Sequence, residues 1–140
     1  MINMRKLRLY LVENDPDEQE FMKEAFMESG QFELVGVGKS GDVLFEWLDQ
    51  GNPAPDFVLS DLNMPGKNGH DILNELTSSD KYPRIPVVIT STSSTPFIID
   101  RCMKEGATAY IVKPETFARY VPFVSELYGR LIEVIEAKPV

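Results

Sequence analysis

The sequence predicts an α/β domain in which one parallel sheet carries helices on both faces. Short apolar segments that favour strands alternate with longer segments of helical periodicity, five of each. Several strand segments are apolar throughout, which is typical of strands covered on both faces. Alternating strands and helices form parallel sheets through right-handed crossovers. At 140 residues the chain fits a single domain, residues 1–140, and no repeat suggests a second.

Five strands are expected, and turn residues follow most of them. In chain order they are Leu7 to Glu13, Phe32 to Val37, Phe57 to Asp61, Pro86 to Ser91 and Ala109 to Val112. In open α/β sheets, ligands bind at the carboxyl ends of the strands, where the strand order reverses. Together with the alternation of elements, this rule predicts a doubly wound sheet of order 2-1-3-4-5 with all strands parallel.

The expected helices begin near Pro16, Ser40, Gly69, Pro96 and Tyr120. The first has Asp15 as its N-cap and ends at Gly30. Apolar residues at helical spacing mark the inward face of the second helix, namely Val43, Leu44, Trp47 and Leu48. The last helix has a longer stripe of Val124, Leu127, Tyr128, Leu131, Val134 and Ile135.

Composition excludes several classes of protein. A net charge of −8 argues against binding to a nucleic-acid backbone, which requires basic patches. The only cysteine, Cys102, excludes an internal disulfide and fits the reducing cytoplasm. The first apolar run, Leu9 to Val12, is too short for a secretory signal or a membrane span. We therefore expect a cytoplasmic protein without membrane attachment.

Polar residues follow the strands at the edge where ligands are expected. Glu13 and Asn14 follow the first strand, Asp61 ends the third, Ser91 ends the fourth, and Lys113 follows the fifth. Carboxylate and amide oxygens without His or Cys suit a hard cation such as Mg²⁺. A carboxylate nucleophile beside a metal ion and a lysine can accept a phosphoryl group as an aspartyl phosphate.

With these residues in this order, the chain resembles a response-regulator receiver domain over essentially its whole length. That family has an acidic pair after the first strand, a phosphoacceptor Asp after the third, Thr or Ser after the fourth and Lys-Pro after the fifth. The most specific stretch is Phe57 to Gly69, with its Asp-x-x-Met-Pro-x-x-x-Gly core. Leu11 to Pro16 also resembles the small stand-alone receivers that lack an output domain. The resemblance implies a flavodoxin-like fold.

The resemblance also implies the partners and the roles of individual residues. Asp61 would take a phosphoryl group from a sensor histidine kinase or a histidine phosphotransfer protein. Ser91 would bond a phosphoryl oxygen, Lys113 would pair with the phosphoryl group, and Tyr110 would be the aromatic switch residue coupled to Ser91. The output surface of the family binds a downstream protein and often forms a homodimer. Such a domain phosphorylates and dephosphorylates itself and is not a turnover enzyme.

The resemblance further implies an Mg²⁺ site whose ligands are Glu13, Asn14, Asp61 and the backbone carbonyl of Asn63. The family usually has an acid where this chain has Asn14, so two carboxylates remain where three are usual. Asp15 is not expected to replace the missing acid, since a helix N-cap directs its side chain at backbone N–H groups. We therefore expect Mg²⁺ to bind, but more weakly than with an acid at position 14.

Two alternatives stay open. In the first, the chain is a pseudo-receiver that binds partners after phosphotransfer has weakened or been lost. In the second it is an enzyme, either a phosphohydrolase with an Asp nucleophile or a flavin-binding domain. A phosphohydrolase would need a second acid where this chain has Asn63. A flavin site would need a Ser-, Thr- or Gly-rich loop at residues 13–16, where this chain has Glu-Asn-Asp-Pro. The sequence therefore argues against both kinds of enzyme.

Some residues are expected to have no part in the site. Asp56 is predicted to be a solvated strand entrance, the sole histidine His70 to be exposed and inert, and Cys102 to fill space. A partner-facing apolar patch is predicted near the start of the last helix, formed by Phe97, Tyr120 and Phe123.

Overall fold

The computed structural model of the chain describes residues 5–113 and 120–136. Within these ranges, five parallel strands form one sheet of order β2-β1-β3-β4-β5, which confirms the predicted fold class and strand order. The strands are β1 (Leu7–Val12), β2 (Phe32–Gly38), β3 (Phe57–Asp61), β4 (Val87–Ser91) and β5 (Ala109–Val112). The helices are α1 (Pro16–Ser29), α2 (Gly41–Asp49), α3 (Gly69–Ser78), α4 (Pro96–Lys104) and α5 (Tyr120–Glu136).

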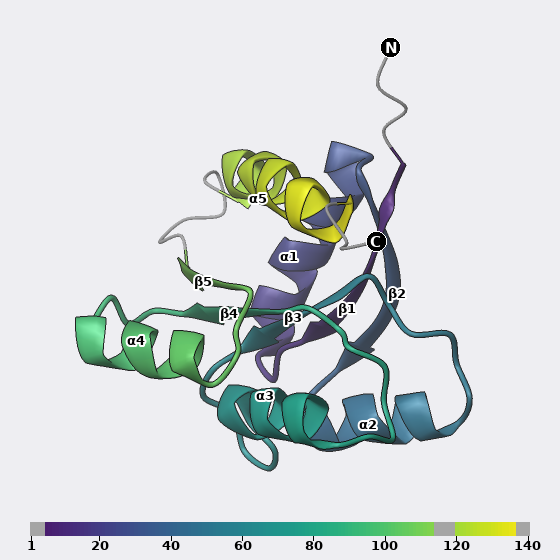
Figure 1. Cartoon of the computed structure of the whole chain (residues 1–140). Helices are drawn as coiled ribbons and strands as arrows, with labels where there is room; N and C mark the ends of the chain where they lie inside the picture. Colours follow the sequence, from purple (N-terminus) through teal and green to yellow (C-terminus); the bar gives the residue numbers. More distant parts are fainter. Residues whose placement is uncertain (1–4, 114–119, 137–140) are drawn as a thin grey trace.

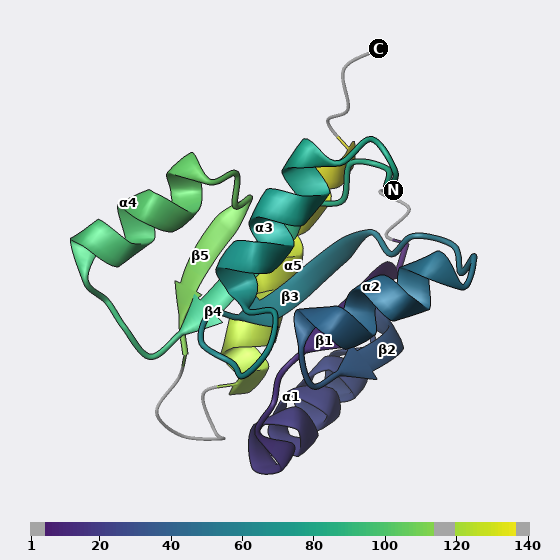
Figure 2. The same ribbon diagram turned by 90° about the horizontal axis from the view of Figure 1, so that it is seen from below.

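Helices cover both faces of the sheet (Figure 1). Helices α1 and α5 lie on one face, and α2, α3 and α4 lie on the other, as the view turned by 90° also shows (Figure 2). Successive residues of β1 point to opposite faces, so Leu9 and Leu11 join the core under α1 and α5 while Tyr10 and Val12 join the other core. The sheet therefore separates two apolar cores.

The signals at the helix ends explain where the elements begin and stop. The Asp15 carboxylate accepts hydrogen bonds from the amides of Asp17 and Glu18, as predicted for an N-cap. Gly30 ends α1 in the left-handed region with φ 69°, a conformation that glycine adopts without steric cost. The side chains and backbones of Asn68 and Asp71 cap each other reciprocally at the start of α3.

Two predicted core positions are wrong. Val43 of α2 and Val134 of α5 are 39% and 52% exposed, whereas their neighbours Phe45 and Ile135 are buried. In α5 the buried residues Leu127, Leu131 and Ile135 recur every four residues, and Val134 lies about 100° around the helix from Ile135. The rotation of a helix against the sheet decides which of its apolar residues are buried, and here it leaves Val43 and Val134 at the margin of the buried face.

Asp56 is not the solvated strand entrance that the sequence suggested. Its carboxylate accepts hydrogen bonds from the Arg5 guanidinium at 2.9 Å and from the Arg8 amide at 2.8 Å. Arg5 also donates to Glu136 at 2.8 Å, so one guanidinium joins the approach to β1, the start of β3 and the end of α5. These hydrogen bonds form a polar cluster at the amino ends of β1 and β3.

The predicted apolar patch does not form a single surface among the described side chains. Phe97 on α4 is 77% exposed, but Phe123 is half-buried against the core under α1 and α5. The side chain of Tyr120 lies outside the described part of the chain. No helix among the described residues is long and apolar enough to span a membrane.

Candidate functional site

Three charged side chains meet at the carboxyl ends of β1, β3 and β5. The Lys113 ammonium lies 2.8 Å from a Glu13 carboxylate oxygen and 3.4 Å from an Asp61 carboxylate oxygen. All three side chains are at most 12% exposed. The Lys113 amide donates to the Ser91 carbonyl at 2.8 Å, which holds the lysine backbone beside the end of β4. The predicted convergence of Glu13 and Lys113 on Asp61 is therefore present in the structure.

Burial sets the protonation behaviour of this cluster. It raises the pKa of Asp61 above the ordinary value, because the attraction of Lys113 offsets only part of the desolvation and the charge of Glu13 adds to it. Burial alone would lower the pKa of Lys113, but its hydrogen bond to Glu13 and the charge of Asp61 outweigh that effect and raise the pKa. Lys113 therefore stays protonated, and the desolvation of the Asp61 carboxylate is only partly offset by its neighbours.

Glu13 is held on both of its carboxylate oxygens. Lys113 donates to one of them, and the amide of Asp15 donates to the other at 3.1 Å. The Asp15 carboxylate is engaged at the start of α1, so it does not replace the acid that Asn14 lacks. Glu13 is buried and Asp61 is partly buried, whereas Asn14 and Asn63 are exposed in the loops that follow β1 and β3.

The first turn of α3 approaches Asp61 closely because it begins with a glycine. A Cβ on Gly69 would lie 3.1 Å from the Asp61 carbonyl oxygen and 3.0 Å from the Cα of Leu62. The Gly69 amide also donates to the Leu62 carbonyl. The loop after Asp61 is therefore anchored directly to the start of α3.

Ser91 and Tyr110 both contact the loop between β4 and α4. Ser91 is buried, and its hydroxyl accepts a hydrogen bond from the Ser93 amide at 3.1 Å. The Tyr110 hydroxyl donates to the Ser93 carbonyl at 2.8 Å. The two residues thus hold the amide and the carbonyl of Ser93, a residue that the sequence did not single out because it stands in a run of six Ser and Thr residues, 90–95.

His70 differs from its prediction. Its side chain is only 16% exposed, and it pairs with the Glu105 carboxylate through its Nδ1 atom. The two residues are 35 positions apart in the sequence, one before and one after β4, so no local sequence signal connects them.

Comparison with known proteins agrees with the site and the fold. Residues 9–124 match the response regulator receiver domain family. The transcriptional regulatory protein MalR of Bacillus subtilis is 30% identical over 120 residues, covering 86% of this chain and 49% of MalR. The two-component response regulator ORR11 of rice (Oryza sativa subsp. indica) is 33% identical over 106 residues, covering 76% of this chain and 68% of ORR11. This chain thus spans about half the length of MalR and two thirds of ORR11.

Solved structures agree as well. The phosphorylated cyanobacterial phytochrome response regulator RcpA superposes with a TM-score of 0.79 at 28% identity, covering 92% of this chain and 96% of RcpA. Together with the sheet and the Glu13, Asp61 and Lys113 cluster, these matches place the chain among the domains of two-component signalling. The chain belongs to the response regulator receiver domain family.

Proposed function

We propose that Asp61 accepts a phosphoryl group, in an Mg²⁺-dependent reaction, from a sensor histidine kinase or a histidine phosphotransfer protein. The observation that carries this proposal is the Lys113 ammonium between Glu13 and Asp61, 3.4 Å from an oxygen of the Asp61 carboxylate. RcpA, which is 28% identical to this chain, has been solved in a phosphorylated form, and this supports the same chemistry here.

In this reaction an Asp61 oxygen forms a bond to phosphorus while the P–N bond of the phosphohistidine donor breaks. The bonding electron pair returns to the imidazole nitrogen, and the product is an acyl phosphate. Lys113 lies where its charge can pair with a phosphoryl oxygen, and it stays protonated because Glu13 holds it. Burial around Asp61 removes water that would compete for its carboxylate.

The residues of this site fit Mg²⁺, since they supply oxygen ligands only. The carboxylates of Glu13 and Asp61, the Asn14 amide and the Asn63 carbonyl would hold it. When bound, the ion neutralises charge on the transferring phosphoryl group. Glu13 then has two tasks, because it also positions Lys113 at 2.8 Å.

Phosphorylation would act on partners through the loop between β4 and α4. Ser91 and Tyr110 both bond Ser93, so a phosphoryl oxygen that draws the Ser91 side chain toward Asp61 would pull the Ser91 hydroxyl away from the Ser93 amide. The Tyr110 ring and α4 would then be free to rearrange toward a downstream protein or a second copy of this chain. In this role the chain is a cytoplasmic signalling domain rather than a turnover enzyme.

A pseudo-receiver that no longer transfers phosphoryl groups is the second candidate. Asn14 favours it, because Asp15 caps α1 and cannot supply the missing charge. The two candidates predict different responses to a phosphodonor.

The decisive experiment is incubation with acetyl phosphate and Mg²⁺, followed by intact mass measurement. We expect the gain of one phosphoryl group in the wild type and none in Asp61→Asn or in the presence of EDTA. Asp56→Asn is a matched control, since it changes the same residue type at the other end of β3 and should still be phosphorylated. No gain in the wild type would favour the pseudo-receiver, and equal gain in Asp61→Asn would disprove the assignment of Asp61.

A further inference from the structure

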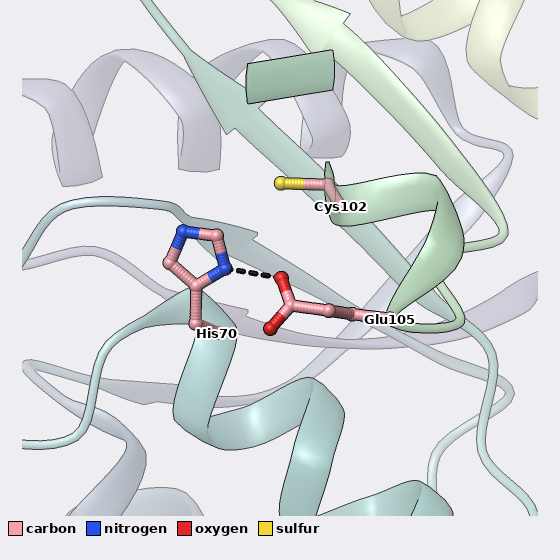
Figure 3. Close-up of side chains that lie close together, drawn as sticks. All are labelled: His70, Cys102 and Glu105. Carbon is pink, nitrogen blue, oxygen red and sulfur yellow. Dashed lines mark hydrogen bonds and ion pairs between the residues drawn. The ribbon is translucent and has the colours of Figure 1, made fainter. Parts of the chain in front are cut away.

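A second group of potential metal ligands lies between α3 and α4, away from the Asp61 cluster (Figure 3). His70 stands in the first turn of α3, Cys102 in the last turn of α4, and Glu105 directly after α4. One ligand atom from each side chain, the imidazole nitrogen, the sulfur and a carboxylate oxygen, lies within 4.8 Å of the other two. In Figure 3 the His70 ring and the Glu105 carboxylate face each other, and the Cys102 side chain lies above them.

The three side chains of this cluster are largely buried, and neighbouring groups hold the Glu105 carboxylate in place. Cys102 is fully buried and forms no disulfide, while the side chains of His70 and Glu105 are each 16% exposed. One Glu105 oxygen faces His70, and the Asn74 amide donates to the other at 3.3 Å. The cluster is therefore closed on the side of Cys102 and reachable from solvent past His70 and Glu105.

We propose that His70, Cys102 and Glu105 bind a transition-metal ion of the zinc class, with water as the fourth ligand. Nitrogen, thiolate sulfur and carboxylate oxygen are the three ligand types that Zn²⁺ takes in proteins, whereas Mg²⁺ is bound by oxygen alone. The ion would thus differ in chemistry from the one proposed for the Asp61 cluster. Three protein ligands and an open fourth position are also typical of catalytic zinc sites, whereas structural zinc sites have four protein ligands.

The geometry requires only small side-chain movements. With bond lengths of about 2.0–2.3 Å, the ligand atoms of a tetrahedral zinc site lie about 3.3–3.8 Å apart. The ligand atoms lie at most 4.8 Å apart, so the widest separation must shorten by about 1 Å, whereas His70 and Glu105, which bond each other directly, must move apart to admit the ion. Cys102 lies in the last turn of α4 and Glu105, three residues later, is the C-cap of the helix, so both side chains lie on the same side of this end of α4.

Two features of the metal-free cluster oppose binding, and both can be overcome. Burial raises the pKa of the Cys102 thiol, so the ion must displace its proton. Arg101 lies 3.7 Å from the Glu105 carboxylate and competes for it, but its side chain is 57% exposed and can turn to solvent. Occupancy would join the start of α3 to the end of α4, a helix in which Cys102 is the one buried residue.

Calorimetric titration of the full chain with Zn²⁺, in excess Mg²⁺, tests the proposal. We expect one Zn²⁺ per chain in the wild type and in Asp61→Asn. His70→Gln and Glu105→Gln each remove a ligand at a partly exposed position and should weaken binding by more than about 100-fold. Asn74→Ala, which removes only the hydrogen bond to Glu105, should weaken it by about 10-fold.

Spectroscopy with Co²⁺ in place of Zn²⁺ identifies the sulfur ligand. A thiolate-to-cobalt charge-transfer band should appear in the wild type and in Asp61→Asn and should be absent in Cys102→Ser. If Cys102→Ser does not fold, His70→Gln and Glu105→Gln still test the site. The proposal would be overturned if the wild type did not bind Zn²⁺, if both Gln variants bound it as tightly as the wild type, or if Asp61→Asn lost it. None of these results bears on the phosphorylation of Asp61.

Discussion

Strand β3 has an aspartate at each end, and the pKa values of the two carboxylates are shifted in opposite directions. Asp56 directly precedes the strand and has a side chain that is 20% exposed, and Asp61 is its last residue and is 12% exposed. Burial alone would raise the pKa of Asp56, but the Arg5 guanidinium and the Arg8 amide outweigh it and lower the pKa below its ordinary value. At Asp61 burial prevails, and the pKa is raised.

The difference lies in how the neighbouring donors are shared. Asp56 has a guanidinium at 2.9 Å and a backbone amide at 2.8 Å directed at it. The cation of Asp61 is closer to Glu13, at 2.8 Å, than to Asp61 itself, at 3.4 Å. A carboxylate with its own donors stabilises the fold, whereas one that shares a cation with a second acid remains available for reaction. The following substitutions test this contrast.

The largest effect is expected from Lys113→Met. It leaves Glu13 and Asp61 buried without the cation between them, and removing one partner of a buried ion pair costs about 3 kcal/mol or more. Urea denaturation in EDTA would measure the loss in free energy of unfolding. Lys67→Met is the control, because its pair with Glu75 is more than a third exposed on both sides and should contribute less than about 1 kcal/mol. Equal losses in the two variants would contradict the contrast.

Asp56→Asn should lower the free energy of unfolding by about 1–2 kcal/mol at pH 7, because it removes charged hydrogen bonds with a partly exposed arginine. The folded pKa of Asp56 lies below the unfolded one, so its contribution is present above the ordinary pKa of about 3.9 and is lost as the pH falls through the folded value. The difference from the wild type should therefore shrink in urea melts between pH 7 and about pH 3. A difference that stays constant with pH would assign the loss to shape rather than to charge.

Asp61→Asn should have the opposite sign and raise the free energy of unfolding by up to about 1 kcal/mol at pH 7 in EDTA. Because burial raises the folded pKa, the favourable contribution of Asp61 exists only while it is protonated, below its ordinary pKa, and it disappears as the pH rises through the raised value. At neutral pH the charged residue is therefore a cost. Destabilisation by this variant would show that Lys113 compensates Asp61 fully.

The smallest effect is expected from Asn14→Asp, which restores the usual acid beside Glu13. A third carboxylate at an exposed position should tighten Mg²⁺ binding about threefold, or about 0.7 kcal/mol, measured by Trp47 fluorescence or by donor-driven phosphorylation. Gln50→Glu adds the same charge at the far end of α2 and should leave Mg²⁺ affinity unchanged. Equal affinities of the wild type and Asn14→Asp would show that charge count does not determine binding.

The sequence predicted the site better than its surroundings. Glu13, Asp61 and Lys113 stand at strand ends, and in a parallel sheet of known order such ends meet at one edge. Turn residues mark these ends, so the convergence of the three could be derived without any knowledge of packing. The roles of Ser91, Tyr110, Asn14 and Asn63 rest on the resemblance and remain predictions.

Contacts that depend on how helices sit on the sheet could not be derived. Arg5 and Glu136 are 131 positions apart, and His70 and Glu105 are 35 apart, so the first pair exists only once α5 is docked and the second only once α3 and α4 are docked. The choice between Val134 and Ile135 likewise depends on the rotation of α5, which a run of adjacent apolar residues does not specify. The sequence therefore misplaced Val134 and His70 for the same physical reason, whereas Asp56 was misplaced because its partners Arg5 and Arg8 come from the neighbouring strand and the segment before it.

The bridge from Arg5 to Glu136 has a consequence for the connectivity of the chain. It joins the segment before β1 to the last turn of α5 at 2.8 Å, at the amino edge of the sheet and opposite Asp61. A short linker could replace this contact covalently, and new termini could be opened at the exposed turn after α2, at Gly51, since folds with adjacent ends tolerate permutation. We expect such a circular permutant to retain the Asp61 cluster, because the contacts among Glu13, Asp61 and Lys113 lie at the opposite edge of the sheet.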